Sequence, residues 1–346
     1  MLKLDNKRGD LLRAAIVGVG RQAISDHLPG IINSENAELV ALCDINPYSL
    51  TDIGTKLRVP TYTSVDELLN TEKLDFIIVS SSNNSHKQII EKAAAKGIHI
   101  LKEKPFAISL KEAMYLKRLS EEKGIHIMTA LKRRFNAIYY MFFQFIDKIG
   151  TPFMVDIKYS LHVSNPHEGW RGNKEQAGGG CILDMGYHMI DLLIWYFGLP
   201  SEVHAEMSCL AKPEEYYDAE DTANILFRYN TGLHGTMRLS RFIAPKEECI
   251  KISGSEGIIE IQRDKIVRYD TKGIEQDSMR LTSSGLIASS KQIDYFCKII
   301  SEGKMNPSNP DFHLKHLAFI EACYKSKNSG SYEKVRNILE EKWLKI

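Results

Sequence analysis

Short apolar runs alternate with stretches of helical period from Arg13 to Ala130. The apolar runs predict strands at Ala14–Val17, Leu39–Cys43, Phe76–Val79, His99–Leu101 and Ile125–Thr129, with a weaker signal at Thr61–Thr63. Continuous β-branched residues are typical of strands that are buried on both faces. Helices are predicted at Ser85–Lys96 and Leu110–Lys123, and a glycine follows each, as at a helix C-terminus. This alternation predicts a doubly wound parallel α/β sheet.

The pattern changes after Ala130. A helix rich in aromatic residues is predicted at Phe135–Lys148, and helices return at Ser284–Glu302 and beyond. Between them lie predicted strands at Met154–Val163, Val203–Leu210, Ala223–Tyr229, Leu233–Phe242 and Ile250–Ile261, the last interrupted by a turn at 253–257. Successive strands of this kind predict an α+β domain on a largely antiparallel, open sheet. We therefore expect one domain over residues 1–132 and a second over 133–346.

Composition narrows the class of protein. Hydrophobic residues make up 43% and charged residues 26%, and the net charge is +1, so the sequence indicates a soluble protein without a nucleic-acid or membrane partner. The first ten residues lack the apolar stretch of a signal peptide. Six cysteines are scattered without a Cys-x-x-Cys pair, which favours reduced thiols in the cytoplasm.

Polar residues stand out where the predicted strands end, which is where open α/β sheets bind their ligands. The first strand runs into Gly18-Val19-Gly20-Arg21-Gln22-Ala23, and the fourth and fifth end at Ser80-Ser81-Ser82-Asn83 and at Glu103-Lys104-Pro105. Gly18 would permit a tight turn, and Gly20 would let the backbone approach a pyrophosphate at a helix N-terminus. The first domain is therefore expected to be a Rossmann domain.

Asp44 ends the second strand, 26 residues after Gly18. A carboxylate at this position accepts hydrogen bonds from the adenosine ribose hydroxyls and repels a 2′-phosphate. Ile45 follows Asp44, with no arginine beside it to pair with such a phosphate. The sequence therefore favours NAD over NADP.

The second domain contains an unusual polar stripe. Asp184, His188 and Asp191 are spaced four and three residues apart within an apolar stretch, so on a helix they would share one face. Buried charged groups need partners or a cavity. His188 could be a general base oriented by Asp184, or the residues could satisfy one another in a core. A metal site is least favoured because no further ligand stands at suitable spacing.

Taken together, the glycine turn, Glu103-Lys104-Pro105 and the Gly178-Gly179-Gly180…Asp184…His188…Asp191 stretch resemble the glucose–fructose oxidoreductase / inositol dehydrogenase (Gfo/Idh/MocA) family. The resemblance covers most of the chain and includes the turn from Ser82 to His86. It implies that Lys104, Asp184 and His188 line a substrate site beside the nicotinamide, and that Asn83 and Glu103 help to hold the cofactor.

The expected site residues fall into two groups. Those expected to bind the cofactor are Gly18, Val19, Gly20, Arg21, Gln22, Ala23, Asp44, Ile45, Ser80, Ser82, Asn83, His86, Glu103 and Lys104. Those expected to bind the substrate are Lys104, Trp170, Arg171, Asp184 and His188, and no metal is expected.

The chemistry expected is removal of a hydride from a secondary alcohol of a sugar, a cyclitol or a sugar derivative. An unperturbed histidine titrates near pH ~6.5, so His188 is suited to accept the hydroxyl proton. Lys104 would stabilise the developing alkoxide. Two alternatives remain open: a glycosidase that uses NAD without net redox change, and a non-catalytic nucleotide-binding regulator. An open sheet also predicts a homodimer or homotetramer through the second domain.

Overall fold

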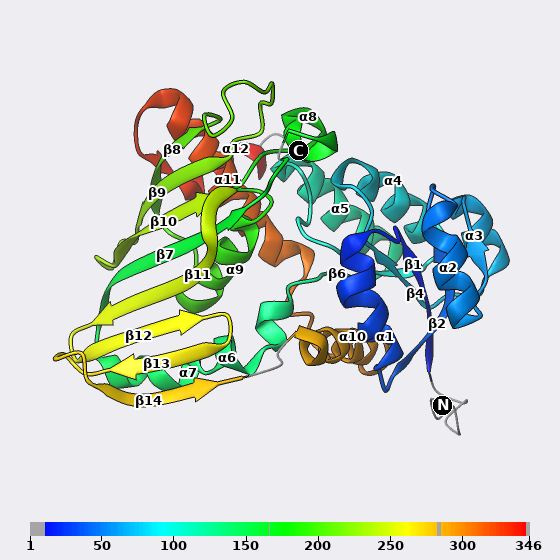
Figure 1. Ribbon diagram of the computed structural model, residues 1–346, viewed down its shortest axis with the longest axis horizontal. Coiled ribbons are helices and arrows are strands. Elements are labelled where there is room, and N and C mark those ends of the chain that lie inside the picture. Colours follow the sequence, from blue (N-terminus) through cyan, green and yellow to red (C-terminus); the bar gives the residue numbers. More distant parts are fainter. Residues whose placement is uncertain (1–10, 166, 282–284, 344–346) are drawn as a thin grey trace. The chain divides into compact units, whose positions relative to one another are not determined.

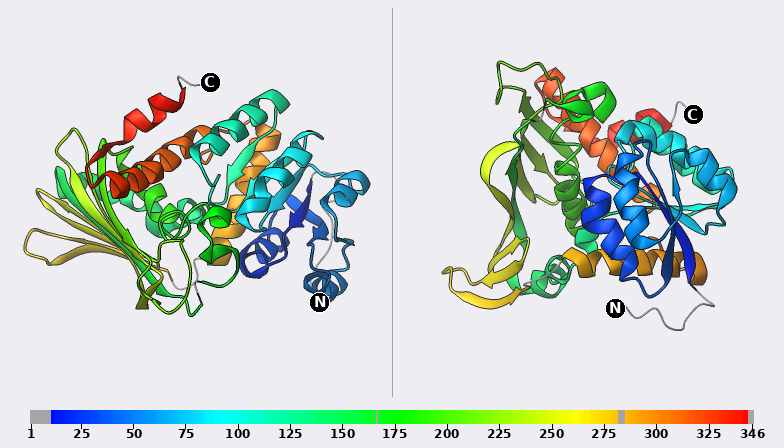
Figure 2. Two further views of the ribbon diagram at one scale, coloured as in Figure 1. Left: turned by 90° about the horizontal axis from the view of Figure 1, so that it is seen from above. Right: turned by 45° about the vertical axis from the view of Figure 1, so that its right-hand side comes forward.

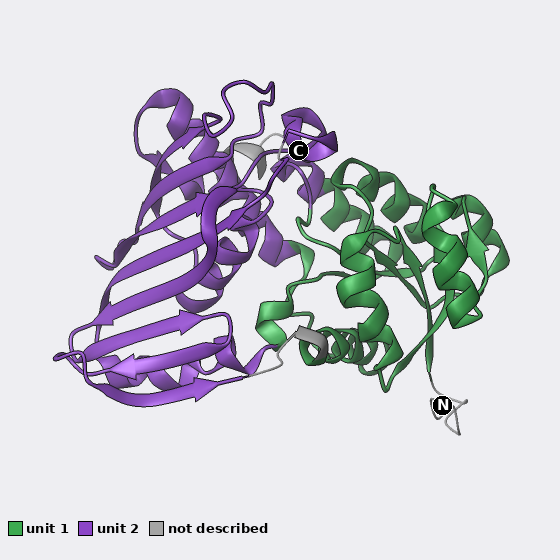
Figure 3. Ribbon diagram, viewed as in Figure 1, with its two compact units in different colours: residues 1–106, 115–135, 285–310 green, residues 107–114, 136–284, 311–346 purple. Residues whose placement is uncertain are grey.

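The computed structural model describes residues 11–165, 167–281 and 285–343. The chain forms two compact units that are interleaved in sequence (Figure 3). The first unit comprises Met1–Phe106, Tyr115–Phe135 and Gly285–Pro310, and the second comprises Ala107–Met114, Asn136–Ser284 and Asp311–Ile346. The expected division into domains 1–132 and 133–346 differs from these segments, because Gly285–Pro310 belongs to the first unit.

A six-stranded sheet forms the centre of the first unit (Figure 1). Its order is β3-β2-β1-β4-β5-β6, and all neighbouring strands are parallel. The strands are β1 (Leu12–Val17), β2 (Ala37–Cys43), β3 (Thr61–Tyr62), β4 (Phe76–Val79), β5 (His99–Lys102) and β6 (Ile127–Thr129). This arrangement confirms the predicted doubly wound sheet, whose strand order reverses between β1 and β4.

Helices connect these strands, as the alternating pattern predicted. They are the π-helical turn η1 (Ala23–His27), α1 (Leu28–Ile32), α2 (Tyr48–Leu57), α3 (Val65–Thr71), α4 (Asn83–Ala94) and α5 (Leu110–Lys123). The 3-10 turn η2 (Lys132–Phe135) and α10 (Gly285–Glu302) follow the last strand of the sheet. Gly97 and Gly124, which follow α4 and α5, have φ of 71° and 61°, a left-handed conformation that favours glycine. The predicted glycine helix ends are therefore confirmed.

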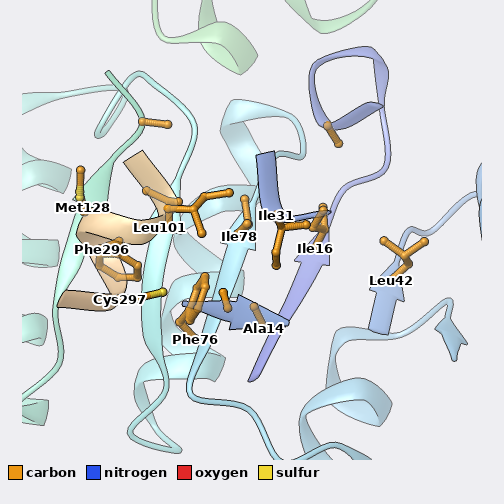
Figure 4. Packing of buried hydrophobic residues seen from close by; sticks show 14 of the residues in the cluster. Ala14, Ile16, Ile31, Leu42, Phe76, Ile78, Leu101, Met128, Phe296 and Cys297 are labelled. Atoms are coloured by element: carbon orange, nitrogen blue, oxygen red, sulfur yellow. The ribbon is translucent and has the colours of Figure 1, made fainter. Parts of the chain in front are cut away.

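Helix α10 completes the core of the first unit, although it is distant in sequence. Phe296 is buried and packs edge-on against Phe76 of β4, with ring centroids 5.4 Å apart (Figure 4). The Asp294 carboxylate accepts hydrogen bonds from the Ser34 hydroxyl at 2.6 Å and from the Glu35 backbone N–H at 2.9 Å. A boundary at residue 132 assigns α10 to the second domain, whereas its side chains fill the core of the first unit.

The second unit is built on a nine-stranded sheet of order β14-β13-β12-β11-β7-β10-β9-β8-β15. Only the β10–β7 pair is parallel, so the prediction of a largely antiparallel sheet is confirmed. The strands are β7 (Pro152–His162), β8 (Glu202–Ser208), β9 (Thr222–Arg228), β10 (His234–Ser240), β11 (Phe242–Gly254), β12 (Gly257–Gln262), β13 (Lys265–Tyr269), β14 (Glu275–Arg280) and β15 (Glu333–Lys334). The expected turn at 253–257 joins β11 to β12.

Helices α9 (Gly186–Phe197) and α11 (Pro310–Ser329) lie along one face of this sheet (Figure 2). A Cβ atom at Gly186 would lie 2.5 Å from Leu239 of β10, so α9 packs directly onto the strand. The unit also contains α6 (Ala137–Tyr140), α7 (Phe142–Phe145), η3 (Ile146–Ile149), η4 (Gly169–Gly172), α8 (Lys174–Ala177) and α12 (Val335–Trp343). No helix in the described part of the chain has the length and apolarity that crossing a membrane requires.

The predicted aromatic helix at Phe135–Lys148 is instead a series of short turns. Asn136 caps α6 by accepting a hydrogen bond from the Ile138 N–H at 3.0 Å, and α6 ends after one turn. Phe142 then stacks on Tyr196 of α9 with ring centroids 3.9 Å apart. Aromatic side chains lose rotamer freedom in a helix, so packing against α9 outweighs their modest helix propensity.

Replacing Phe296 with alanine tests the role of α10. The truncation should destabilise the protein by about 3–5 kcal/mol, because it leaves a cavity under the parallel sheet. Ile287→Ala on the same helix is a matched control, since Ile287 is exposed and should change stability little. Urea unfolding of both variants measures the effect, and equal losses would show that α10 is not part of this core.

Candidate active site

The glycine turn after β1 lies where the strand order reverses. Gly18 has φ of 92°, and a Cβ atom there would lie 2.4 Å from the Ser81 backbone nitrogen. Any other residue would be strained in this conformation and would collide with the backbone after β4. A Cβ atom at Gly20 would meet no described heavy atom within 4 Å, so that backbone stays accessible. Such a turn suits a pyrophosphate, which needs close approach to backbone N–H groups.

Asp44 ties the end of β2 to this glycine turn. Its Oδ2 accepts a hydrogen bond from the Val19 N–H at 2.7 Å, and its Oδ1 accepts one from the Asn46 N–H at 2.9 Å. The carboxylate remains partly exposed, and the adjacent Ile45 is 90% exposed. The fold therefore brings together the glycine turn and the acidic strand end that the sequence placed 26 residues apart.

The segment after β4 contributes half-buried serines and two buried polar side chains, Asn83 and His86. Ser80 donates its N–H to the Val17 carbonyl at 2.8 Å, and Asn83 is buried in the first turn of α4, which follows Ser82. The His86 ring nitrogen Nε2 donates to the Ser81 carbonyl at 3.0 Å. Burial, followed by the nearby Lys102 charge, lowers the pKa of His86 to about 3, so this ring is neutral. His86 thus braces the strand end against α4.

Lys104 is the one residue between Ile100 and Ala107 that is not buried. The loop that carries it is held by Lys102, which sequence analysis did not single out. The Lys102 ammonium is buried and donates to the carbonyls of Pro105 at 2.5 Å and Phe106 at 2.7 Å. A buried charge is costly without such partners. Lys102 therefore ties the backbone that follows the Lys104–Pro105 peptide back to the end of β5.

Glu103 faces away from solvent and pairs with His27 of η1, with 2.8 Å between Oε1 and Nε2. Its Oε2 accepts the Lys104 N–H at 3.2 Å. Burial by itself would raise the pKa of Glu103, but the hydrogen bond from His27 and the positive charges of His27, Lys104 and Lys132 outweigh burial and lower the pKa to about 2. His27 lies 76 residues from Glu103 in the chain, and no sequence signal marked it.

The remaining residues of the expected cofactor group surround the same turn. Val19 and Ala23 are buried, whereas Arg21 and Gln22 are exposed. Gln22 is hydrogen-bonded to Asp26, and Asp26 is also paired with Lys132 of η2. These contacts anchor the π-helical turn that follows the glycines.

In the second unit, every residue from Gly179 to Ile194 is buried except Asp184 and His188. The sequence analysis placed both on one helix, but α9 begins at Gly186, so Asp184 lies in the turn before it. Asp191 is buried within α9 and faces His316 of α11, with 3.0 Å between Oδ1 and Nε2. Of the three polar residues that the sequence placed on one face, Asp184 and His188 are therefore half-buried and Asp191 is fully buried.

Gly180, before this turn, is required by Glu220, which sequence analysis also did not single out. The buried Glu220 carboxylate accepts the N–H groups of Gly180 at 2.8 Å and Ile182 at 3.0 Å. A Cβ atom at Gly180 would lie 2.1 Å from the Glu220 carbonyl oxygen. The turn that carries Asp184 is thus held by hydrogen bonds from its backbone to the buried Glu220 carboxylate.

Two arginines approach Asp184. Arg171 Nε lies 3.8 Å and Arg241 Nη2 lies 3.6 Å from Asp184 Oδ2. The Arg171 guanidinium lies over the Trp170 ring at 4.2 Å from its centroid. Arg171 and Asp184 were both expected to bind substrate, and the structure brings them together. Arg241, which is buried, was not anticipated because it lies 57 residues further along the chain than Asp184.

Lys104 belongs to the first unit, whereas Asp184 and His188 belong to the second. In the described residues, no group of three or more His, Cys, Asp or Glu side chains is arranged to hold a metal ion.

A 3-2-1-4-5-6 parallel sheet with a glycine turn after β1 and an acidic residue after β2 defines the dinucleotide-binding class of α/β proteins. A family model described as "Oxidoreductase family, NAD-binding Rossmann fold" matches residues 12–131, and one described as "GFO/IDH/MocA C-terminal domain" matches residues 146–260. The chain belongs to the GFO/IDH/MocA oxidoreductase family, and the resemblance seen in its motifs is confirmed. It is an NAD-binding oxidoreductase.

Known relatives are similar along most of the chain. D-apiose dehydrogenase of Paraburkholderia graminis is 24% identical over 352 residues, covering 94% of this chain and 90% of that protein. Myo-inositol 2-dehydrogenase of Thermotoga maritima is 25% identical over 271 residues, covering 76% of this chain and 79% of that protein. The solved WlbA dehydrogenase of Bordetella pertussis, in complex with NADH and UDP-GlcNAcA, matches with a TM-score of 0.80 at 20% identity, covering 95% and 99% of the two chains.

The lowered pKa of Glu103 predicts a pH-dependent contribution to stability. Because the folded pKa lies below the ordinary value of 4.5, the stabilisation should be complete above pH 4.5 and should disappear as the pH falls toward about 2. Wild type should therefore be more stable than Glu103→Gln near neutral pH, and the gap should close on acidification. Urea unfolding over a pH series measures it, and a gap that does not change with pH would contradict the prediction.

Proposed function

We propose that this chain is an NAD-dependent dehydrogenase that transfers a hydride between a secondary alcohol of a sugar, cyclitol or sugar derivative and nicotinamide. One observation carries the proposal. In two otherwise buried segments, the side chains left accessible are Lys104 in the first unit and Asp184 and His188 in the second. A histidine can accept the hydroxyl proton, a lysine can stabilise the developing alkoxide, and a carboxylate can accept hydrogen bonds from other hydroxyls, which together suit alcohol oxidation. The named activities of the D-apiose and myo-inositol relatives support the same class of substrate.

In this proposal residues 1–132 bind NAD, with the glycine turn at the pyrophosphate and Asp44 at the adenosine ribose. Glu103 and Asn83, both buried, help to hold the cofactor, and residues 133–346 bind the substrate. The open backbone at Gly20 fits a phosphate, and the carboxylate of Asp44 is already oriented by Val19 and Asn46. Bound NAD supplies the hydride acceptor.

We assign the remaining chemistry to three side chains. His188 accepts the proton of the substrate hydroxyl, so that a carbonyl can form as the hydride leaves. Lys104 stabilises the negative charge that develops on the same oxygen. Asp184 accepts hydrogen bonds from neighbouring substrate hydroxyls and orients the substrate. Lys102 keeps the backbone that carries Lys104 in place through its bonds to the carbonyls of Pro105 and Phe106.

An assay of product and cofactor together tests this function. A dehydrogenase should form NADH in proportion to the sugar or cyclitol that it consumes. Release of an aglycone from a glycoside at constant NADH would instead identify a glycosidase that uses NAD transiently. NAD binding without turnover of any sugar, cyclitol or glycoside would support a regulator.

Substitution of the three assigned groups should damage chemistry more than cofactor binding. Positioned proton transfer contributes about 10²–10⁴-fold, so His188→Ala should lose turnover on that scale. Lys104→Met should lose at least as much, because both a charge and a donor disappear. Asp184→Asn should mainly raise KM. Steady-state kinetics measure these effects, with NAD affinity determined alongside.

Asp191→Asn is the matched control for this series. Asp191 is 1% exposed and bonded to His316, so its loss should lower the melting temperature without a specific effect on turnover. A His188→Ala protein that binds NAD and keeps near wild-type turnover would remove His188 from the mechanism. Greater sensitivity of turnover at Asp191 than at His188 would contradict the assignment.

Cofactor choice follows from Asp44. Its carboxylate should repel the 2′-phosphate of NADP, so wild type should bind NAD more tightly, and Asp44→Ala should narrow the difference. Fluorescence titration with both cofactors provides the measurement. Equal or tighter binding of NADP by the wild type would refute the preference.

We further propose that the chain is a cytoplasmic homodimer or homotetramer that associates through the second unit. All six cysteines are free, as expected in a reducing compartment. The sheet face opposite α9 and α11 carries exposed residues of both charges and apolar ones such as Leu226, and it contains a hollow of about 600 Å³ lined by residues including Lys158, Lys251 and Glu260. Mixed charges of this kind can pair with a second copy.

Light scattering tests the assembly. We expect a mass at least twice the 39.3 kDa of the chain at micromolar concentration, and Leu226→Lys should shift it toward the monomer. Leu210→Lys, at a residue that is 75% exposed outside the sheet strands, is the control. A wild-type mass of one chain across this range would refute the proposal.

A further inference from the structure

The guanidinium of Arg171 makes no side-chain hydrogen bond within the described residues. The Arg171 side chain is 56% exposed, and its stacking on Trp170 fixes the guanidinium plane without using its N–H donors. The one carboxylate within ion-pair range of Arg171 among the described residues is Asp184, at 3.8 Å from Nε, which is beyond hydrogen-bond distance. The donors of Arg171 are therefore still available to a ligand.

The Asp184 carboxylate also forms an ion pair with a second arginine, Arg241. The Arg241 side chain is only 5% exposed, and its Nη2, 3.6 Å from Asp184 Oδ2, is buried without a hydrogen-bond partner in the described part of the chain. Its Nη1 donates to the Arg171 carbonyl at 3.3 Å, so it also holds the turn that carries Arg171. A buried cation depends on its counter-charge far more than an exposed one does. The negative charge of Asp184 is therefore needed more by the buried Arg241 than by the exposed Arg171.

Several other carboxylates of the second unit contact groups other than Arg171. Glu168 accepts from the Asn165 amide, Glu215 faces His167, Asp218 accepts the Lys174 N–H, Glu220 accepts from Gly180, Ile182 and Tyr324, and Asp221 accepts from Tyr217 and Ala211. Of these carboxylates none lies within ion-pair range of Arg171 in the described residues, so Asp184 is its one close counter-charge and the guanidinium can take a further anion.

We propose that Arg171 determines specificity by pairing with an acidic group of the substrate, so that the preferred substrates are sugar or cyclitol derivatives bearing a carboxylate or a phosphate. The inference rests on the proposed function, because it places the substrate beside Asp184. Arginine presents paired donors that match either anion, and such charge-assisted pairs are among the strongest hydrogen bonds. The shared chemistry is a planar or tetrahedral oxyanion held against the Trp170-stacked guanidinium.

Pairs of substrates that share the same ring and differ only in an acidic group test the proposal. NADH formation is measured with D-glucose, D-glucuronate and D-glucose 6-phosphate, and with myo-inositol and its monophosphate. We expect an acidic member to exceed its neutral counterpart in kcat/KM by about 10–100-fold, the value of one charge-assisted pair. Preference for glucuronate identifies a carboxylate substrate, and preference for a phosphorylated member identifies a phosphate.

Variants locate the preference. Arg171→Gln should remove it by lowering kcat/KM for the acidic substrate alone, whereas Arg171→Lys should retain part of it because the charge remains. Arg336→Gln is the control, because it removes the same charge from a side chain on α12 that is 85% exposed. It should leave kcat/KM unchanged for both acidic and neutral substrates. Because Arg171 is itself largely exposed, its replacement should not unfold the protein. Equal loss for acidic and neutral substrates would show that Arg171 only braces the turn, and would overturn the proposal.

Failure of the inference is distinct from failure of the proposed function. NADH formed from neutral members as readily as from acidic ones overturns the acidic specificity and leaves the dehydrogenase intact. If no member yields NADH, calorimetry of the NADH-loaded protein with D-glucuronate and D-glucose 6-phosphate decides the inference. Binding of either anion that is lost in Arg171→Gln supports the site, and absence of binding overturns it.

Discussion

Between β1 and β4 the backbone of Gly18 runs so close to Ser81 that a Cβ atom would lie 2.4 Å from the Ser81 nitrogen. This close approach is possible because both strands are parallel and end at the same edge of the sheet. It brings the glycine turn, Asp44 and the polar segment after β4 into one neighbourhood. The nucleotide-binding arrangement of the first unit depends on this contact between two main chains.

The second unit reaches a comparable result through a buried carboxylate. Glu220 binds the N–H groups on both sides of Cys181, and the chain can bend around it only because residue 180 lacks a side chain. The turn exposes Asp184, and α9 then exposes His188 while Asp191 locks the helix to α11. In both units buried charges hold the backbone that carries half-buried polar groups.

Local patterns predicted much of this fold. The strand Phe76–Val79 and the helix Leu110–Lys123 have the predicted bounds, because each is continuous in its own period and is closed by a turn residue. The strands Lys265–Tyr269 and Glu275–Arg280 were not predicted, since they are short, carry charged residues and pair at the edge of the sheet. The aromatic segment after Phe135 was predicted as one helix because its packing against α9 is not visible locally.

The candidate site shows the same limit. Gly18, Asp44, Lys104, Asp184 and His188 could be selected because each stands at the end of a predicted element or interrupts an apolar run. Their supporting groups could not, because His27, Glu220 and Arg241 act across long sequence separations and carry no local motif.

The late position of α10 in the chain has a consequence for synthesis. Phe296 and Cys297 belong to the same core as Ala14 and Phe76, so the nucleotide-binding unit lacks part of its interior until almost 300 residues have been made (Figure 4). While residues 136–284 of the second unit are translated, the parallel sheet lacks the apolar side chains of α10 that cover part of it. The first unit therefore cannot complete its core from its N-terminal segments alone, and until α10 is made it exposes apolar surface of the kind that favours aggregation.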